Sequence, residues 1–192
     1  MAAAVPVVRH ARREDVPAIL SLIRELADYE KALSSVLATE SSLAATIAFA
    51  PSSSPAVISP DPTTNLPITE PTSPSKPARC FVLESPSTGE VVGMALYFYN
   101  YSTWRARPGI FLEDLYVKQS ERKKGYGRRL LVQLAKEVEA MEGGRLEWNV
   151  LKWNEPSIRF YESEAVGAEM MREWVGMRVD GEGLTKLAHS LD

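Results

Sequence analysis

The stretch Arg122-Lys123-Lys124-Gly125-Tyr126-Gly127-Arg128-Arg129 lies between an apolar run at residues 109–117 and an amphipathic pattern at residues 130–141. The run is typical of a strand, and the pattern is typical of a helix. Five of the eight intervening residues are basic, although the start of a helix carries partial positive charge and usually attracts acids. Five basic residues at a place that usually attracts acids indicate that an anion binds there and balances their charge.

The two glycines of this basic turn (residues 122–129) favour the same interpretation. Gly125 and Gly127 allow a ligand to approach the backbone closely, and free N–H groups at a helix start bind phosphate oxygens. The spacing matches neither the Gly-x-x-x-x-Gly-Lys-Ser/Thr loop nor the Gly-x-Gly-x-x-Gly fingerprint. We therefore predict a phosphate or pyrophosphate site of another kind. The alternative is a basic turn that only faces solvent.

Composition limits the function classes. The chain has 192 residues and a net charge of −3, which predicts one domain over residues 1–192 and argues against nucleic-acid partners, since these need a broad basic face. The single cysteine, Cys80, lies in an apolar run and fits a core thiol in a reducing, cytoplasmic setting. His10 and His189 lack metal-ligand spacing, so no metal is expected. No apolar run approaches the roughly 20 residues of a membrane span, so no membrane partner is expected.

Strand and helix patterns alternate after an initial hairpin region, which predicts an α/β (α+β) fold with a mixed, mostly antiparallel sheet and helices on both faces. Strands are predicted at residues 5–11, 79–84, 90–101, 109–117, 146–151 and 170–179. Helices are predicted at residues 13–31, after an N-cap at Thr39, from the basic turn to about residue 141, after an N-cap at Asn154, and at residues 184–191.

Residues 51–78 differ from the rest of the chain. They hold eight of its thirteen prolines, mixed with serine and threonine. Such a composition cannot bury enough apolar surface to offset its ordering entropy. We predict a mobile surface insertion within the single domain. A phosphorylated regulatory loop is the alternative.

Several short segments, in the right order, resemble the GNAT N-acetyltransferase superfamily across essentially the whole chain except this insertion. Arg122-Lys123-Lys124-Gly125-Tyr126-Gly127 fits the family's pyrophosphate motif, Arg/Gln-x-x-Gly-x-Gly/Ala. Other segments look like the spermidine/spermine N-acetyltransferase group within it: residues 24–30, 101–104, 112–117 and 153–157, with Phe160-Tyr161 and Trp174.

One departure points to a branch of that group. The polyamine enzymes carry Tyr-Asp-Pro-Trp, whereas this chain has Tyr101-Ser102-Thr103-Trp104, and Arg172 stands near the place of another acid. Fewer acids weaken the case for a long polycation as substrate. The sequence looks more like the thialysine N-epsilon-acetyltransferase branch, which prefers amino-acid-like amines.

The resemblance implies acetyl-CoA as cosubstrate, bound where the strand before the basic turn splays from its neighbour. The backbone of Leu115, Tyr116 and Val117 would bind the pantetheine. The pyrophosphate would lie on the amides and basic side chains of the turn, and the helix after Asn154 would add further contacts. The remaining implied residues are Arg122, Lys123, Lys124, Gly125, Tyr126, Gly127, Arg128, Asn154, Ser157 and Tyr161.

The acceptor amine must lose a proton before it attacks, because an alkylammonium has a pKa of about 10.4. The resemblance makes Glu113 the proton acceptor, directly or through water, and Tyr161 the donor to the departing thiolate. Without the resemblance, the residues alone favour a solvated strand-end acid for Glu113 and a core aromatic for Tyr161. On the substrate side the resemblance implies Glu30, Trp104, Glu113, Asp114 and Trp174, although both tryptophans also suit a core position.

These expectations combine into direct acetyl transfer to the primary amine of a small molecule, in a ternary complex, by a homodimer. Two alternatives stay open at this level. The acceptor is instead a protein lysine or histone tail, or the chain is a non-catalytic module that binds acyl-CoA.

Overall fold

A computed structural model describes residues 5–52, 60–63 and 66–192 of the chain. The chain divides into two compact parts, Met1–Leu151 and Lys152–Asp192. The expected single domain therefore stays a prediction.

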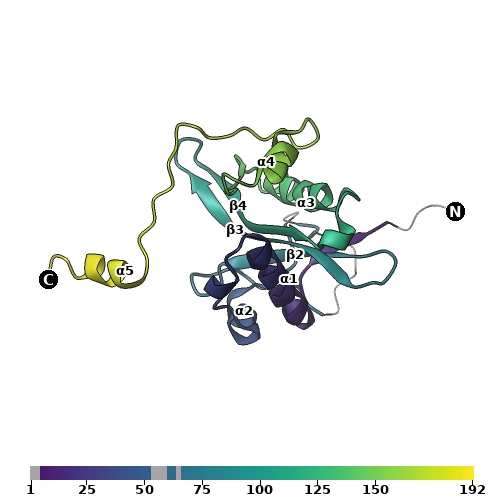
Figure 1. Cartoon of the computed structure of the whole chain (residues 1–192), viewed down its shortest axis with the longest axis horizontal. Helices are drawn as coiled ribbons and strands as arrows, with labels where there is room; N and C mark the ends of the chain where they lie inside the picture. Colours follow the sequence, from purple (N-terminus) through teal and green to yellow (C-terminus); the bar gives the residue numbers. More distant parts are fainter. Residues whose placement is uncertain (1–4, 53–59, 64–65) are drawn as a thin grey trace. The chain divides into compact units, whose positions relative to one another are not determined.

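The first part is built on a five-stranded sheet in the order β1-β2-β3-β4-β5 (Figure 1). Neighbouring strands are antiparallel from β1 to β4, and β4 and β5 are parallel. This arrangement confirms the predicted mixed, mostly antiparallel sheet. The predicted strand at residues 146–151 is too long, because only its first three residues pair. The strands are β1 Val7–His10, β2 Ala78–Glu84, β3 Val91–Ser102, β4 Arg107–Val117 and β5 Leu146–Trp148.

Helices cover both faces of this sheet, as predicted. Helices α1 (Val16–Tyr29) and α2 (Glu40–Thr46) lie on one face, and α3 (Tyr126–Ala140) lies on the other (Figure 1). Short 3-10 turns span Arg13–Asp15, Leu33–Ser35 and Gln119–Glu121. Thr39 caps α2, since its Oγ1 accepts a hydrogen bond from the Ser42 N–H at 3.1 Å.

The apolar core on the α1 face follows from the helical spacing of α1. Ile19 and Leu22 are completely buried there and pack in one cluster with strand residues such as Val82 and Met94. Cys80 is buried in the same cluster, which confirms it as a core residue. Burial raises the pKa of this thiol well above its ordinary value, so Cys80 is a poor nucleophile.

The α3 face holds a buried polar group that the sequence did not reveal. The hydroxyls of Tyr97 and Tyr99 each donate to the carboxylate of Glu137 on α3, both at 2.6 Å. His10 lies beside them, with its ring tilted by 33° against the ring of Phe81 and the two centroids 4.1 Å apart. Desolvation, reinforced by Arg79, lowers the pKa of His10 to about 3, so this imidazole is neutral at physiological pH.

The proline-rich insertion is anchored where it returns to the sheet. Glu70 N–H donates to Phe49 O at 2.8 Å, and the Glu70 carboxylate pairs with Arg13 and Lys76. Residues 53–59 and 64–65 of the insertion lie outside the described residues. The predicted mobility of the insertion therefore stays a prediction.

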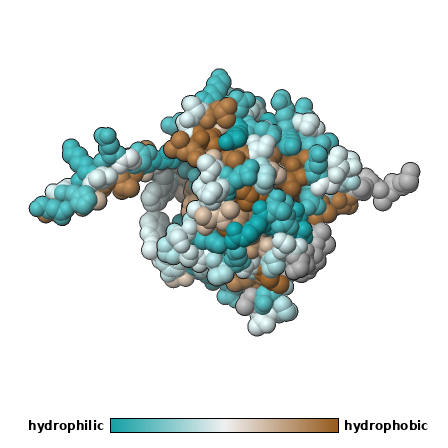
Figure 2. Space-filling view, turned by 90° about the horizontal axis from the view of Figure 1, so that it is seen from below, coloured by the Kyte–Doolittle hydropathy of each residue, from teal (hydrophilic) through white to brown (hydrophobic). Residues whose placement is uncertain are grey.

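The second part contains two helices, α4 (Glu155–Glu162) and α5 (Gly181–Ala188). The prediction of a strand at residues 170–179 is wrong, because these residues form no helix or strand. A strand needs a hydrogen-bonded neighbour, and alternating apolar residues do not supply one. Apolar side chains of this segment are exposed, among them Met171, Trp174, Val175 and Met177. Figure 2 shows one face of the molecule, on which hydrophobic patches lie among hydrophilic side chains.

Candidate active site

A bulge in β4 interrupts the sheet at Glu113. Leu96 of β3 pairs with Asp114 and Tyr97 pairs with Leu112, so Glu113 has no partner in this ladder. The Glu113 side chain is exposed. Bulges bend a strand locally and change the direction of a side chain, which is why they recur beside active sites.

Strand β5 leaves β4 at the same point. Among the described residues, the parallel pairing joins only residues 110–112 of β4 to Leu146–Trp148. On the β5 side, residues 113–117 of β4 therefore present backbone groups without a strand partner. The predicted pantetheine contacts, Leu115, Tyr116 and Val117, lie on this unpaired edge. An extended ligand can hydrogen-bond to such an edge as a strand would.

The basic turn begins soon after β4 ends and leads into α3. Lys123 and Gly125 both have left-handed backbone conformations, with φ of 65° and 77°. Gly125 is the N-cap of α3, where the described structure shows no capping side-chain hydrogen bond. The first N–H groups of α3 are therefore available to a ligand. A Cβ on Gly125 would meet nothing within 4 Å, so the space beside the turn is open.

The basic side chains of the turn do not all face solvent. Lys124 pairs with Glu121 at 2.8 Å. Arg122 lies over the rings of Tyr29 and Tyr116, and its Nε donates to Val117 O at 3.0 Å. Lys123 and Arg128 are exposed. A phosphate-facing role therefore suits the exposed pair better than it suits Arg122.

Three predicted acidic residues lie close together, since the charges of Glu113 and Glu30 both act on Asp114. Asp114 pairs with Leu96 and Tyr116 pairs with Met94, a member of the α1-face core, so Asp114 points to that face. Burial, followed by the charges of Glu113 and Glu30, raises the pKa of Asp114 to about 6. Burial also raises the pKa of Glu30, at the end of α1. This acidic cluster (Glu30, Glu113, Asp114) suits a cationic ligand.

The predicted aromatic wall is not part of a core. The Trp104 side chain is 89% exposed in the turn between β3 and β4, and Trp174 is 64% exposed in the second part. The core interpretation of both tryptophans is therefore wrong. Their contact with an amine stays a prediction.

The remaining predicted residues lie together on α4. Asn154 is buried and caps this helix, since its Oδ1 accepts from the Ser157 N–H at 3.3 Å. Ser157 and Tyr161 are four residues apart and share one face of the helix. Tyr161 is half-buried, and its ring packs 5.3 Å from the ring of Phe160. The Asn154 amide thus lies at the start of α4, and the Ser157 hydroxyl and the Tyr161 phenol follow on one face of the helix.

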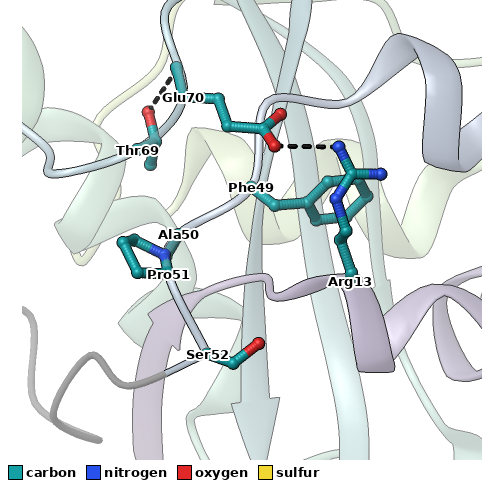
Figure 3. A pocket seen from close by; sticks show the side chains of 7 residues that line it. All are labelled: Arg13, Phe49, Ala50, Pro51, Ser52, Thr69 and Glu70. Carbon is teal, nitrogen blue, oxygen red and sulfur yellow. Dashed lines mark hydrogen bonds and ion pairs between the residues drawn. The ribbon is translucent and has the colours of Figure 1, made fainter.

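A cavity of about 440 Å³ lies elsewhere in the first part (Figure 3). Ala50 N–H donates to Ala11 O and Ala11 N–H donates to Cys80 O, which places this cavity towards the start of β2. The basic turn follows the other end of the sheet, where Val117 pairs with Gly93 and Gly93 with Leu83. No predicted site residue lines the cavity. Its lining residues are Arg13, Phe49, Ala50, Pro51, Ser52, Thr69 and Glu70.

The described residues lack two further features. They contain no group of three histidine, cysteine, aspartate or glutamate side chains that could hold a metal ion. Their helices include none with the length and hydropathy required to cross a bilayer.

Comparison with known proteins identifies the family. Residues 49–167 match the acetyltransferase (GNAT) family model. The chain is 35% identical to a thialysine N-epsilon-acetyltransferase of Bos taurus, over 94% of this chain and 96% of that protein. It is 32% identical to an L-ornithine N5-acetyltransferase of Arabidopsis thaliana, over 92% and 85%.

A solved structure, an integron cassette protein of V. cholerae, has the same fold. It superposes with a TM-score of 0.68 at 22% identity, covering 96% of this chain and 98% of that one. The family model and the two relatives, both above 30% identity, show that the chain belongs to the GNAT acetyltransferase family.

Proposed function

With that membership as the premise, we propose that this enzyme transfers the acetyl group of acetyl-CoA to a primary amine of a small, amino-acid-like molecule. One observation carries the proposal: the bulge at Glu113 places an acidic cluster beside an unpaired strand edge, and that edge leads into an uncapped, basic helix start. A cation site, an extended-ligand site and an anion site follow one another along a single stretch of chain.

Acetyl-CoA fits the second and third of these sites. Its pantetheine arm is extended and amide-rich, so it can hydrogen-bond to the edge formed by Leu115, Tyr116 and Val117. Its pyrophosphate suits the N–H groups of Tyr126, Gly127 and Arg128 at the positive end of α3. The exposed side chains of Lys123 and Arg128 add charge. Asn154 and Ser157 on α4 are proposed as further contacts, by family resemblance.

The acidic cluster serves the amine. A primary ammonium loses its proton at about pH 10.4 in water, so at neutral pH the enzyme must both attract the cation and accept its proton. Glu113 is exposed at the bulge and is proposed as the acceptor, directly or through one water. Asp114 and Glu30 supply negative charge behind it. Once neutral, the amine nitrogen attacks the thioester carbonyl.

The second proton transfer involves the departing sulfur. The attacking nitrogen loses its second proton to solvent, the tetrahedral intermediate collapses, the carbon–sulfur bond breaks, and the thiolate takes a proton. A phenol with a pKa of about 10 keeps its proton at neutral pH and can supply it, and Tyr161 is proposed for this role. No acyl-enzyme is required. The buried thiol of Cys80, whose pKa is raised well above its ordinary value, is unsuited to form one.

The acceptor class follows from the relatives and from one local difference. Two similar proteins act, by their names, on thialysine and on L-ornithine, which are both amino acids with a side-chain amine. Ser102 stands where polyamine enzymes carry an acid, so this chain offers one negative charge fewer to a long polycation. We therefore place amino-acid side-chain amines ahead of spermidine.

A homodimer is proposed as the active assembly. Residues 170–179 carry exposed apolar side chains and form no strand in the chain by itself. A second copy can pair with this segment and cover it. Light scattering at micromolar concentration should give twice the mass of the chain. A monomer would contradict the assembly.

The test of the function is CoA release from acetyl-CoA by the purified full chain. The acceptor panel is L-thialysine, L-ornithine, L-lysine, spermidine, putrescine and a lysine-rich histone peptide. Fastest turnover is expected with an amino acid of the first three. Preference for spermidine or the peptide would overturn the acceptor class, and silence with every amine despite acetyl-CoA binding would overturn the catalytic assignment.

A further inference from the structure

Arg122 opens the family motif, yet its side chain is bound by the protein. The guanidinium carbon lies 5.0 Å from the centre of the Tyr29 ring and 5.3 Å from the centre of the Tyr116 ring. Its Nε donates to Val117 O at 3.0 Å. The side chain is half-buried. Two aromatic rings and one hydrogen bond therefore fix the position of the Arg122 side chain.

The two rings belong to different elements. Tyr29 is the last residue of α1, and Tyr116 lies near the end of β4. A second contact reinforces the junction, because the Tyr116 hydroxyl donates to Glu25 of α1 at 3.3 Å. Glu25 and Tyr29 are four residues apart and share a face of α1. The end of α1 is therefore fixed to β4 and to the basic turn.

The junction touches each proposed subsite. Glu30, in the acidic cluster, directly follows Tyr29. Val117, whose carbonyl accepts from Arg122, ends the edge proposed for pantetheine. Lys123, which follows Arg122, begins the left-handed segment proposed for pyrophosphate. A movement of the basic turn that shifts Arg122 must therefore also shift or break its contact with Tyr29 on α1.

We propose that Arg122 is a positioning residue that couples the two substrate subsites, through Tyr29, so that binding of acetyl-CoA at the basic turn orders the end of α1 for the amine. The inference rests on the proposed function, since it presumes that acetyl-CoA binds at the turn. It assigns to Arg122 a role other than direct neutralisation of phosphate charge.

Lysine at position 122 separates the two roles. Lysine keeps the positive charge but lacks the planar group that stacks on rings and the directed Nε–H. A phosphate-neutralising Arg122 is largely replaced by lysine, whereas a coupling Arg122 is not. Tyr29→Leu removes the ring on the α1 side and leaves every basic residue of the turn unchanged. Both variants should therefore lose the same property, which is the ordering of the end of α1 when acetyl-CoA binds at the basic turn.

That property is measured by hydrogen exchange with acetyl-CoA alone, without any amine. In the wild-type chain, acetyl-CoA should slow exchange at residues 123–128 and also at residues 26–31, the latter by about fivefold, a typical coupling between sites. In Arg122→Lys and Tyr29→Leu, protection at residues 123–128 should persist and protection at residues 26–31 should be lost. Arg24→Lys, an exposed arginine of α1 changed in the same way, should behave as wild type.

Three outcomes decide between the possibilities. Wild-type protection at residues 123–128 alone overturns the coupling while leaving the cofactor site intact. Protection at residues 26–31 that survives in Arg122→Lys overturns the role of Arg122. Absence of protection at residues 123–128 in wild type overturns the proposed function itself, and the coupling with it. Equal melting temperatures of the variants exclude a general loss of folding as the cause.

Discussion

Two acids, Glu137 and Asp114, lie on opposite faces of the same sheet and differ in their surroundings. Glu137 is 6% exposed on the α3 face and accepts hydrogen bonds from the hydroxyls of Tyr97 and Tyr99. Asp114 points to the α1 face, where the charges that act on it come from two other acids, Glu113 and Glu30. Burial raises the pKa of both carboxyls.

The difference separates a structural acid, Glu137, from an acid that we propose to be functional, Asp114. The protein supplies donors for Glu137, so this carboxyl is satisfied without a ligand. Around Asp114 the protein adds negative charge instead of a donor or a cation, which disfavours the ionised form unless a cation binds. Clusters with such perturbed carboxyls are characteristic of functional sites. Substitutions on the two sides of this contrast should therefore have different effects.

The acidic cluster should carry the chemistry. Glu113→Gln removes the proposed proton acceptor but keeps the size and polarity of an exposed side chain. We expect kcat/KM for the amine to fall by about 10²–10⁴-fold, the usual contribution of general base catalysis. The melting temperature should stay unchanged. Glu139→Gln, an exposed acid of α3, is the matched control, and equal activity of the two variants would refute the assignment.

Protonation of the departing CoA thiolate should depend on the phenol of Tyr161 on α4. Tyr161→Phe deletes only the hydroxyl, and we expect kcat to fall by roughly 10²-fold, a typical loss for a missing general acid. Acetyl-CoA affinity, measured by calorimetry, should change little. Unchanged turnover would show that the thiolate takes its proton from another source.

Replacing the structural acid, Glu137, should lower the stability of the protein and leave its activity unchanged. Glu137→Leu leaves the buried hydroxyl of Tyr97 and the half-buried hydroxyl of Tyr99 without an acceptor, so the free energy of unfolding should fall by about 2–4 kcal/mol. Activity per folded molecule should be unchanged. Adding Tyr97→Phe and Tyr99→Phe removes the stranded donors and should recover much of the loss in urea titrations. A triple variant no more stable than Glu137→Leu would contradict the network.

Replacing Asp114 should raise the stability of the protein but weaken its binding of the amine. Its folded pKa of about 6 exceeds the ordinary 3.8, so the carboxylate destabilises the folded state fully above pH 6 and not at all below about pH 4. Asp114→Asn should therefore gain about 1–2 kcal/mol at pH 8, an advantage that shrinks as pH falls through this window. Equal stability at pH 8 would contradict the raised pKa.

The same variant sharpens the functional side of the contrast. In the wild-type chain, KM for a cationic amine should rise as pH falls through 6, because protonation of Asp114 removes negative charge. In Asp114→Asn this rise should be absent, and KM at pH 8 should be higher by about tenfold, the loss of a partly solvated ion pair. Initial rates from pH 5 to pH 8 measure both quantities.

Features with local causes were predicted from sequence. Thr39 and Asn154 cap helices because a short polar side chain reaches N–H groups three residues away. The basic turn was placed between strand and helix because the hydrophobic period changes there. Family resemblance then supplied the roles of Glu113, Tyr161 and the residues of the turn, which composition and spacing did not.

Other features depended on partners far along the chain. Glu137 sits in a helix pattern like any exposed acid, and only the tyrosines of β3 explain its burial. The apolar residues at 170–179 suggested a strand, but a strand forms only where a neighbour accepts its hydrogen bonds. The contact of Arg122 with Tyr29 joins two segments that no local pattern relates.

The sequence by itself thus predicted the order of strands and helices as far as α4, the caps of α2 and α4, and an anion site at the basic turn, because these follow from residues within a few positions of each other. Tertiary structure decided the bulge at Glu113, the end of the β5 pairing and the side to which each acid points. Strand register sets all three, since a single extra residue in β4 leaves Glu113 unpaired and turns Asp114 towards α1. Register is fixed only when β3 and β4 pack together.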